Sequence, residues 1–139
     1  MIKLMGRYDA YAYRMNFPLA ATVTTLDEGT WVTLDANGKL VVSDGTAALS
    51  FMAMSSKRAG RDNITPHGGE CTVLVGPYSV WTDKFNGLAS FTSPTTPLKV
   101  TTGGILDIWS SSGGDTADEI VGYAIGEPTA DGLLNVFIK

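Results

Sequence analysis

The chain has 139 residues, a length that fits one domain and permits a sizeable core without disulfides or metals. Charged residues make up only 17 % and the net charge is −4, with the whole acidic excess in the second half. Nucleic-acid-binding proteins carry basic surfaces, so this balance disfavours nucleic acid as a partner. The single cysteine, Cys71, excludes an internal disulfide and a cysteine-based zinc site.

The first 18 residues form a segment in which aromatic and basic side chains are interleaved. The alternation of Tyr11, Tyr13 and Phe17 is typical of an extended chain, although Tyr8 and Tyr11 also suit one face of a helix. We predict an extended N-terminal arm over residues 1–18. Its aromatic side chains either cap the domain's own core or bind a partner.

A single β-rich domain is expected over residues 19–139. Its first strand is predicted at Ala21–Leu26 and ends at an acidic turn that contains a glycine. Next comes a hairpin, Trp31–Asp35 and Lys39–Ser43, around an Asn-Gly pair that tolerates positive φ and so permits a tight reversal.

The apolar run Ala47–Met54 fits either a buried strand or a short helix, and its length favours a strand. The following polar stretch, Ser55–Gly69, reads as a long exposed loop that holds Lys57, Arg58 and Arg61. Long loops in compact domains are usually functional or mobile, so these basic residues are candidates for contact with an acidic surface.

The rest of the chain predicts six further strands and two short helical turns. The strands are Glu70–Val75, Tyr78–Asp83 and four segments within Leu98–Lys139, and the turns are Asn86–Ser90 and Asp115–Ile120. The fold class is therefore mainly β: a small barrel-like or sandwich-like (β-tulip-type) domain with an extended N-terminal arm and one or two short helical turns.

Few side chains suit catalysis. His67 is the only histidine, and a dyad with Cys71 is conceivable, but a cysteine that opens a predicted strand is usually a small buried hydrophobe. No nucleophile elbow, phosphate-binding loop or dinucleotide fingerprint occurs. We expect no catalytic residues, no metal and no cofactor.

Two other groups of residues have alternative interpretations. Scattered carboxylates could pair as in glycosidases, and three of them could bind calcium, but their spacing does not match an EF-hand, and a solvated acidic face is the simpler interpretation. These carboxylates are Asp107, Asp115, Asp118, Glu119, Glu127 and Asp131, with Asp115, Asp118 and Glu119 as the calcium candidates. Trp31, Trp81 and Trp109 could form a sugar-stacking platform, although packing in a core or interface is commoner.

The closing stretch LKVTTGGILDIWSSSGGDTADEIVGYAIGEPTADGLLNVFIK resembles the end of capsid decoration (cement) proteins of tailed bacteriophages. In those proteins a strand, a glycine turn and a second strand precede strands like IVGYAIGEP and DGLLNVFI. The Trp31–Ser43 hairpin and the run AALSFMAM are also similar to their central β-fold. The likeness covers roughly half of the chain and does not extend to residues 1–18 or 55–69.

This resemblance implies a virion structural protein, not an enzyme, that binds the outer surface of an assembled capsid. It would stabilise the shell by bridging neighbouring subunits of the major capsid protein, as a homo-oligomer with a trimer favoured. The expected location is the capsid exterior, after synthesis in the host cytoplasm, and the sequence has no apolar stretch that approaches the length of a membrane span.

We expect aromatic anchors to dominate such a contact, with basic loop residues second. The candidate partner-binding residues are Tyr8, Tyr11, Tyr13 and Phe17, followed by Lys57, Arg58 and Arg61. A different virion β-protein, from a tail tube or fibre, is the main alternative, and a carbohydrate-binding module is a further one.

Overall fold

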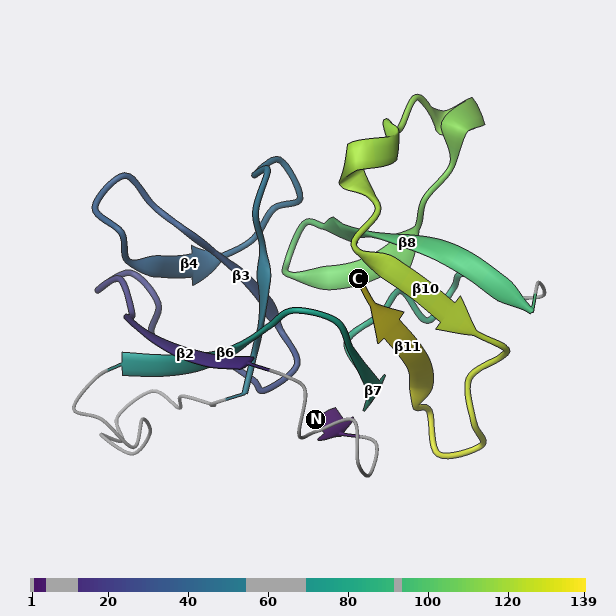
Figure 1. Cartoon of the computed structure of the whole chain (residues 1–139), viewed down its shortest axis with the longest axis horizontal. Helices are drawn as coiled ribbons and strands as arrows, with labels where there is room; N and C mark the ends of the chain where they lie inside the picture. The colour runs from purple at the N-terminus through teal and green to yellow at the C-terminus, as the bar shows by residue number, and fades with distance from the viewer. Residues whose placement is uncertain (1, 5–12, 55–69, 92–93) are drawn as a thin grey trace.

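The computed structural model describes residues 2–4, 13–54, 70–91 and 94–139. In this part of the chain eleven strands form two antiparallel sheets, and the helical content is limited to two short 3-10 turns. The prediction of a mainly β, sandwich-like domain is therefore confirmed, and the sheets do not close into a barrel. In Figure 1 the smaller sheet lies on the left and the larger one on the right.

The small sheet contains five strands in the order β2-β6-β5-β3-β4. Their bounds are β2 Tyr13–Pro18, β3 Trp31–Leu34, β4 Leu40–Val42, β5 Phe51–Ala53 and β6 Glu70–Val75. The expected hairpin is confirmed as β3 and β4, where the Asp35 carboxylate accepts hydrogen bonds from the backbone N–H of Asn37 and Lys39. Gly38 has a φ of +72°, which explains the glycine at this position.

The large sheet contains six strands in the order β1-β7-β11-β10-β8-β9. Their bounds are β1 Ile2–Leu4, β7 Tyr78–Thr82, β8 Thr95–Thr101, β9 Ile105–Ile108, β10 Gly122–Ile125 and β11 Leu134–Ile138. The 3-10 turns η2 (Ser111–Gly113) and η3 (Ala117–Glu119) interrupt the chain between β9 and β10. They project at the top of Figure 1, and η3 lies where a helical turn was predicted.

The main core lies between the two sheets. Trp31, Met52 and Leu74 of the small sheet pack in one cluster with inward-facing side chains of β7, β8, β9, β10 and β11. Successive side chains of a strand point to opposite faces, so every second residue enters this layer. Burying these apolar side chains is the main contribution to folding.

A second apolar cluster covers the opposite face of the small sheet. Val32 and Val73 belong to it, and they are the immediate neighbours of Trp31 and Leu74, which point into the main core. The cover is formed by Ala20, Val23 and Leu26 from the connection between β2 and β3. The central strands β3, β5 and β6 of the small sheet are therefore buried on both faces, while the edge strand β2 stays largely exposed.

Three elements differ from the sequence prediction. Ala21–Leu26 is not a strand: its buried residues recur every third position, and the backbone turns where the N–H of Val23 donates to the carbonyl of Ala20. Ala47–Met54 contributes only Phe51–Ala53 as β5, because the Thr33 hydroxyl holds the Leu49 carbonyl and the preceding residues form bends. Asn86–Ser90 is a reverse turn that the Ala89 N–H closes onto the Asn86 carbonyl.

The described parts of the N-terminal segment are strands of the two sheets. β2 pairs with β6 over all six of its residues, and β1 pairs with β7. Residues 13–18 are thus extended, as the alternation predicts, and lie against their own domain. No helix in the described ranges is long and apolar enough to cross a membrane.

Candidate interaction surface

The structure separates the two described aromatic candidates of the N-terminal segment. Tyr13, at the start of β2, is 74 % exposed and is free to contact a partner. Phe17 instead lies half-buried beside the second apolar cluster, where its ring stacks on Phe51 with centroids 5.7 Å apart. Tyr8 and Tyr11 lie outside the described residues.

The basic candidates Lys57, Arg58 and Arg61 also lie outside the described residues, as does His67. Cys71 is fully buried in β6, as the sequence predicts for a small hydrophobe. In the described ranges no three His, Cys, Asp or Glu side chains come together as a metal site.

The outer face of the large sheet carries a group of apolar side chains that the sequence analysis did not select. We call this group the aromatic face, and it consists of Trp81, Pro97, Tyr123, Ile125 and Phe137. Phe137 and Ile125 are 41 % and 42 % exposed, and the other three are half-buried. Large apolar residues on a solvent-facing sheet surface are typical of an interaction site.

The strand register places these side chains side by side. Tyr123 of β10 lies opposite Phe137 of β11 on one flank and opposite Pro97 of β8 on the other. Directly opposed residues of antiparallel strands have Cβ atoms about 5 Å apart, so the three side chains form a continuous row across the sheet. Trp81, opposite Asn135, is a diagonal neighbour of Phe137.

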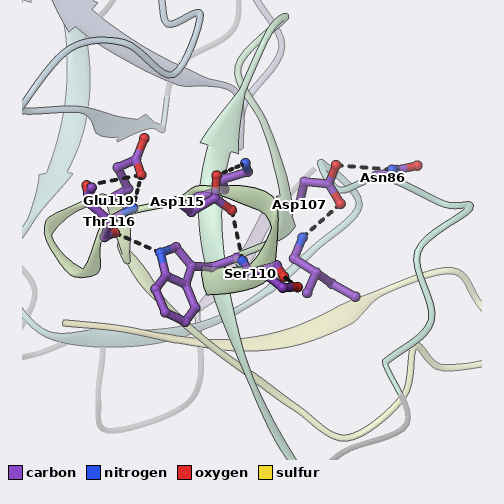
Figure 2. Close-up of polar contacts among 10 residues, drawn as sticks. Asn86, Asp107, Ser110, Asp115, Thr116 and Glu119 are labelled. Atoms are coloured by element: carbon purple, nitrogen blue, oxygen red, sulfur yellow. Dashed lines mark hydrogen bonds and ion pairs between the residues drawn. The ribbon is translucent and has the colours of Figure 1, made fainter.

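Polar contacts fix the segment between β9 and β10 (Figure 2). This segment adjoins the aromatic face through β8, where Lys99 lies two positions after Pro97 and so on the same face of the sheet. Lys99 of β8 forms an ion pair with Asp115, whose other carboxylate oxygen accepts the Ser110 N–H at 2.8 Å. These contacts hold the pKa of Asp115 below its usual range, the hydrogen bond from Lys99 being the main cause. Asp115 therefore stays ionised, and through the Ser110 N–H it anchors the start of the segment between β9 and β10 that contains η2.

The second half of the segment between β9 and β10, around Thr116, is also fixed by hydrogen bonds. The Trp109 indole N–H donates to the Thr116 carbonyl at 2.7 Å, and the Glu119 carboxylate accepts from the N–H and hydroxyl of Thr116. On the neighbouring strand Asp107 accepts from the Asn86 amide at 3.2 Å. Three of the six carboxylates that the sequence leaves open for glycosidase or calcium chemistry thus make structural hydrogen bonds: Asp107, Asp115 and Glu119.

The three tryptophans do not form one platform. Trp31 is only 2 % exposed and lies in the main core, Trp81 belongs to the aromatic face, and Trp109 is tied to Thr116. A sugar-stacking surface built from all three is therefore contradicted by their positions, while Trp81 is available with Tyr123 and Phe137 for contact with another protein.

A signal for the aromatic face is present in the sequence. In β10 the alternation places Tyr123 and Ile125 on one face of the strand and buried Ala124 on the other. In β11 it places Phe137 on one face and buried Val136 on the other. Both sets are apolar, however, so alternation alone does not say which set faces solvent.

Comparison of the chain with models of protein families, with curated proteins and with solved structures found no match.

Proposed function

We propose that this chain is a capsid decoration protein of a tailed bacteriophage. In this proposal it binds the outer surface of the assembled shell and bridges neighbouring subunits of the major capsid protein. The support comes from the likeness of residues 98–139 to the closing segment of such proteins and from the sandwich-like β-domain into which that segment folds.

The observation that carries the proposal is the aromatic face. Two of the strands that present it, β10 and β11, come wholly from the segment that bears the resemblance, and β8 overlaps the start of that segment. Tyr, Trp and Phe are enriched in protein interfaces, where a rigid aromatic side chain buries a large area at a small entropic cost. A sheet surface that presents aromatic side chains beside fixed polar contacts suits a protein that functions by binding another protein.

The mechanism follows from mass action. A protein that binds only the assembled lattice stabilises that lattice in proportion to its occupancy, without any chemical step. A specific contact of this kind buries a total area of about 1,200 Å² or more and usually involves about 20 residues or more on each side, whereas the aromatic face has five. We propose that further contacts come from exposed Tyr13 on the small sheet and from the candidates Tyr8, Tyr11, Lys57, Arg58 and Arg61.

Co-sedimentation with expanded empty capsids of the source phage tests the proposal. We expect saturable binding at a fixed ratio to capsid subunits, together with a higher temperature of shell disruption. The ratio gives the symmetry axis that is occupied, and a trimer predicts the three-fold positions. Binding without any gain in heat resistance would contradict the stabilising role.

The variant Phe137→Asp separates the aromatic face from other surfaces. A charge in the buried centre of an interface weakens binding by about tenfold or more. Val42→Asp is the matched control, because Val42 is also an exposed apolar strand residue but lies on the small sheet. Equal binding by the two variants would remove the aromatic face from the contact.

The N-terminal contribution is tested by Tyr13→Ser and not by deleting residues 1–18. Deletion would remove β1 and β2 from both sheets and so disturb the fold itself. If the pure protein stacks into rings or tubes and does not bind capsids, a tail component becomes the better assignment.

A further inference from the structure

The chain contains two Asn-Gly pairs, Asn37-Gly38 and Asn86-Gly87, and each lies in a turn. An asparagine side chain is most open to attack by its own main chain when glycine follows, because glycine has no side chain to shield its backbone nitrogen. The other asparagines precede bulky residues: Phe17, Ile64 and Val136. The two turns hold their asparagines differently, so one dipeptide occurs in two environments of the same molecule.

Asn37 lies at the exposed tip of the β3–β4 hairpin. Its N–H donates to the Asp35 carboxylate at 2.8 Å, and the Gly38 N–H donates to the Asp35 carbonyl at 3.0 Å. The side-chain amide of Asn37, by contrast, makes no hydrogen bond to any described residue. Its carbonyl carbon is therefore free to turn toward the Gly38 nitrogen. The hydrogen bond that holds this nitrogen lies at a solvent-exposed hairpin tip, where local opening costs little free energy.

Asn86 is half-buried in the turn after β7, and its side chain is held at both ends. The side-chain oxygen accepts the Leu88 N–H at 3.0 Å, and the amide donates to the Asp107 carboxylate at 3.2 Å (Figure 2). The backbone N–H of Asn86 is fixed as well, since it donates to the Leu106 carbonyl at 2.8 Å. The Gly87 N–H makes no hydrogen bond to a described residue. At this site the attacking nitrogen is thus available, and the side chain that it would attack is not.

We propose that Asn37 is a site of spontaneous deamidation in the folded protein and that its hydrogen bonds protect Asn86. The Gly38 backbone nitrogen loses its proton and bonds to the side-chain carbon Cγ of Asn37. The bond between Cγ and the amide nitrogen breaks, and that nitrogen takes up the proton and leaves as ammonia. Water then adds across one of the two carbon–nitrogen bonds of the cyclic imide. Addition at Cγ yields aspartate, and addition at the backbone carbonyl yields isoaspartate, so water is the only other reactant.

The products change the hairpin in two ways. Each adds a carboxylate near that of Asp35, which already accepts the N–H groups of Asn37 and Lys39, so two negative charges come together at the tip. Isoaspartate also adds one methylene group to the main chain inside the tight reversal between β3 and β4. The reaction needs no partner, so the proposal is independent of capsid binding.

Peptide mapping of the full folded chain after incubation at mildly alkaline pH tests the proposal. Mass spectrometry locates the exchange of an amide NH2 for OH, and methylation by an isoaspartyl methyltransferase detects isoaspartate. We expect the product at Asn37 to form about tenfold faster than the product at Asn86, or more, since two side-chain hydrogen bonds lower the reactive population by about that factor. The rate at Asn37 should rise with pH, because the attacking nitrogen must lose its proton.

The chain unfolded in urea is the matched control. Both sites keep their Asn-Gly sequence there and lose their different environments, so their rates should become similar. In the folded chain, Asp107→Ser removes one hydrogen bond from the Asn86 side chain and should raise the rate at Asn86 alone. Asn37→Ser should remove the fast reaction. Thermal unfolding verifies the fold of each variant, and if Asp107→Ser does not fold, the comparison of folded with urea-unfolded wild type still decides.

Two results would overturn the proposal. In the first, Asn86 reacts in the folded chain as fast as Asn37 or faster, which would mean that the available Gly87 nitrogen sets the rate. In the second, Asn37 stays intact in the folded chain but reacts in urea, which would mean that the hydrogen bond from Gly38 to Asp35 protects the hairpin tip. Capsid binding by freshly purified protein, whatever its outcome, bears on the proposed function alone.

Discussion

The two sheets share the alternation of inward and outward side chains, but the central strands of the small sheet are covered on both faces, whereas the large sheet is covered on one. In β3 the neighbours Trp31 and Val32 are both buried, one in each apolar cluster. In β11 Val136 is buried while its neighbour Phe137 is exposed. The centre of the small sheet is therefore committed to the fold, and the large sheet keeps one solvent-facing side.

This difference has a direct consequence for substitutions. The same residue type should cost much stability in the inter-sheet layer and little on the outer face of the large sheet. Outer-face changes should instead act on binding, because their side chains have little to lose within the monomer.

Replacement of tryptophan gives the largest expected contrast. Trp31→Ala should lower the free energy of unfolding by about 3–5 kcal/mol, since it removes a fully buried indole from the layer between the sheets. Trp81→Ala, on the aromatic face, should cost clearly less. Urea denaturation of both variants measures the difference, and equal costs would contradict the assignment of faces.

Contact between the sheets also depends on Gly104, in the turn between β8 and β9. Its φ is +68°, and a Cβ atom there would lie 2.4 Å from the carbonyl oxygen of Trp31, whose N–H donates to the Gly104 carbonyl at 2.8 Å. Gly104→Ala should therefore cost more than the 1–2 kcal/mol or so of a left-handed alanine.

Gly103→Ala is the control for that substitution. Gly103 has a φ of +86°, but a Cβ atom added there would meet no other atom within 4 Å, so alanine carries the backbone strain without the collision. The difference between the denaturation midpoints of Gly104→Ala and Gly103→Ala therefore measures the cost of the collision with Trp31 apart from the cost of backbone strain. Equal midpoints would mean that the turn moves freely relative to β3.

Much of the fold could be predicted because local signals and long-range pairing agree. The Asn-Gly hairpin and the four closing strands are defined by turn residues and alternation within a few positions of each element. Ala21–Leu26 was predicted wrongly as a strand. Its apolar residues suit any segment that covers a sheet, and threonine and valine, although favoured in strands, also occur where the backbone makes no hydrogen bonds to a neighbouring strand.

The candidate site was harder to predict, since the exposure of a residue depends on contacts between distant segments. Phe17 and Phe137 are both phenylalanines in alternating strands, yet Phe17 meets Phe51 and Phe137 faces solvent. The first contact requires that β2 pair with β6, more than fifty positions away along the chain. Sequence alternation indicates which residues share a face but not which face finds a cover.

Tyrosine offers a smaller test of the same contrast. The Tyr78 hydroxyl is buried between the sheets, without a hydrogen-bond partner among the described residues, and burial raises the pKa of Tyr78 well above its usual value. Tyr78→Phe should therefore raise the free energy of unfolding by up to about 1 kcal/mol, because no desolvated hydroxyl remains. Tyr123→Phe, on the aromatic face, should change it little.

The pH dependence of the Tyr78 substitution has a defined sign. A phenol whose pKa is raised in the folded state resists ionisation there, so the folded state loses stability relative to the unfolded chain once the pH rises above the unfolded pKa of about 10. Wild-type stability should fall above that pH more steeply than the stability of Tyr78→Phe. Parallel curves in denaturation series at pH 8 to 11 would mean that the hydroxyl is solvated.

The smallest expected effect concerns the ion pair of Lys99 and Asp115 beside the aromatic face. Because the folded-state pKa of Asp115 is lowered, its contribution to stability is present above the unfolded value of about 3.9 and is lost as the pH falls through the folded value. Asp115→Asn should therefore be slightly less stable than wild type at pH 7 and should converge with it in strong acid. Asp131→Asn, at an exposed carboxylate of the β10–β11 turn, is the control for the change of net charge. If Asp115→Asn also weakens capsid binding while Asp131→Asn does not, the contacts of Asp115 help to position the aromatic face. If capsid binding is unchanged, these contacts stabilise the fold alone.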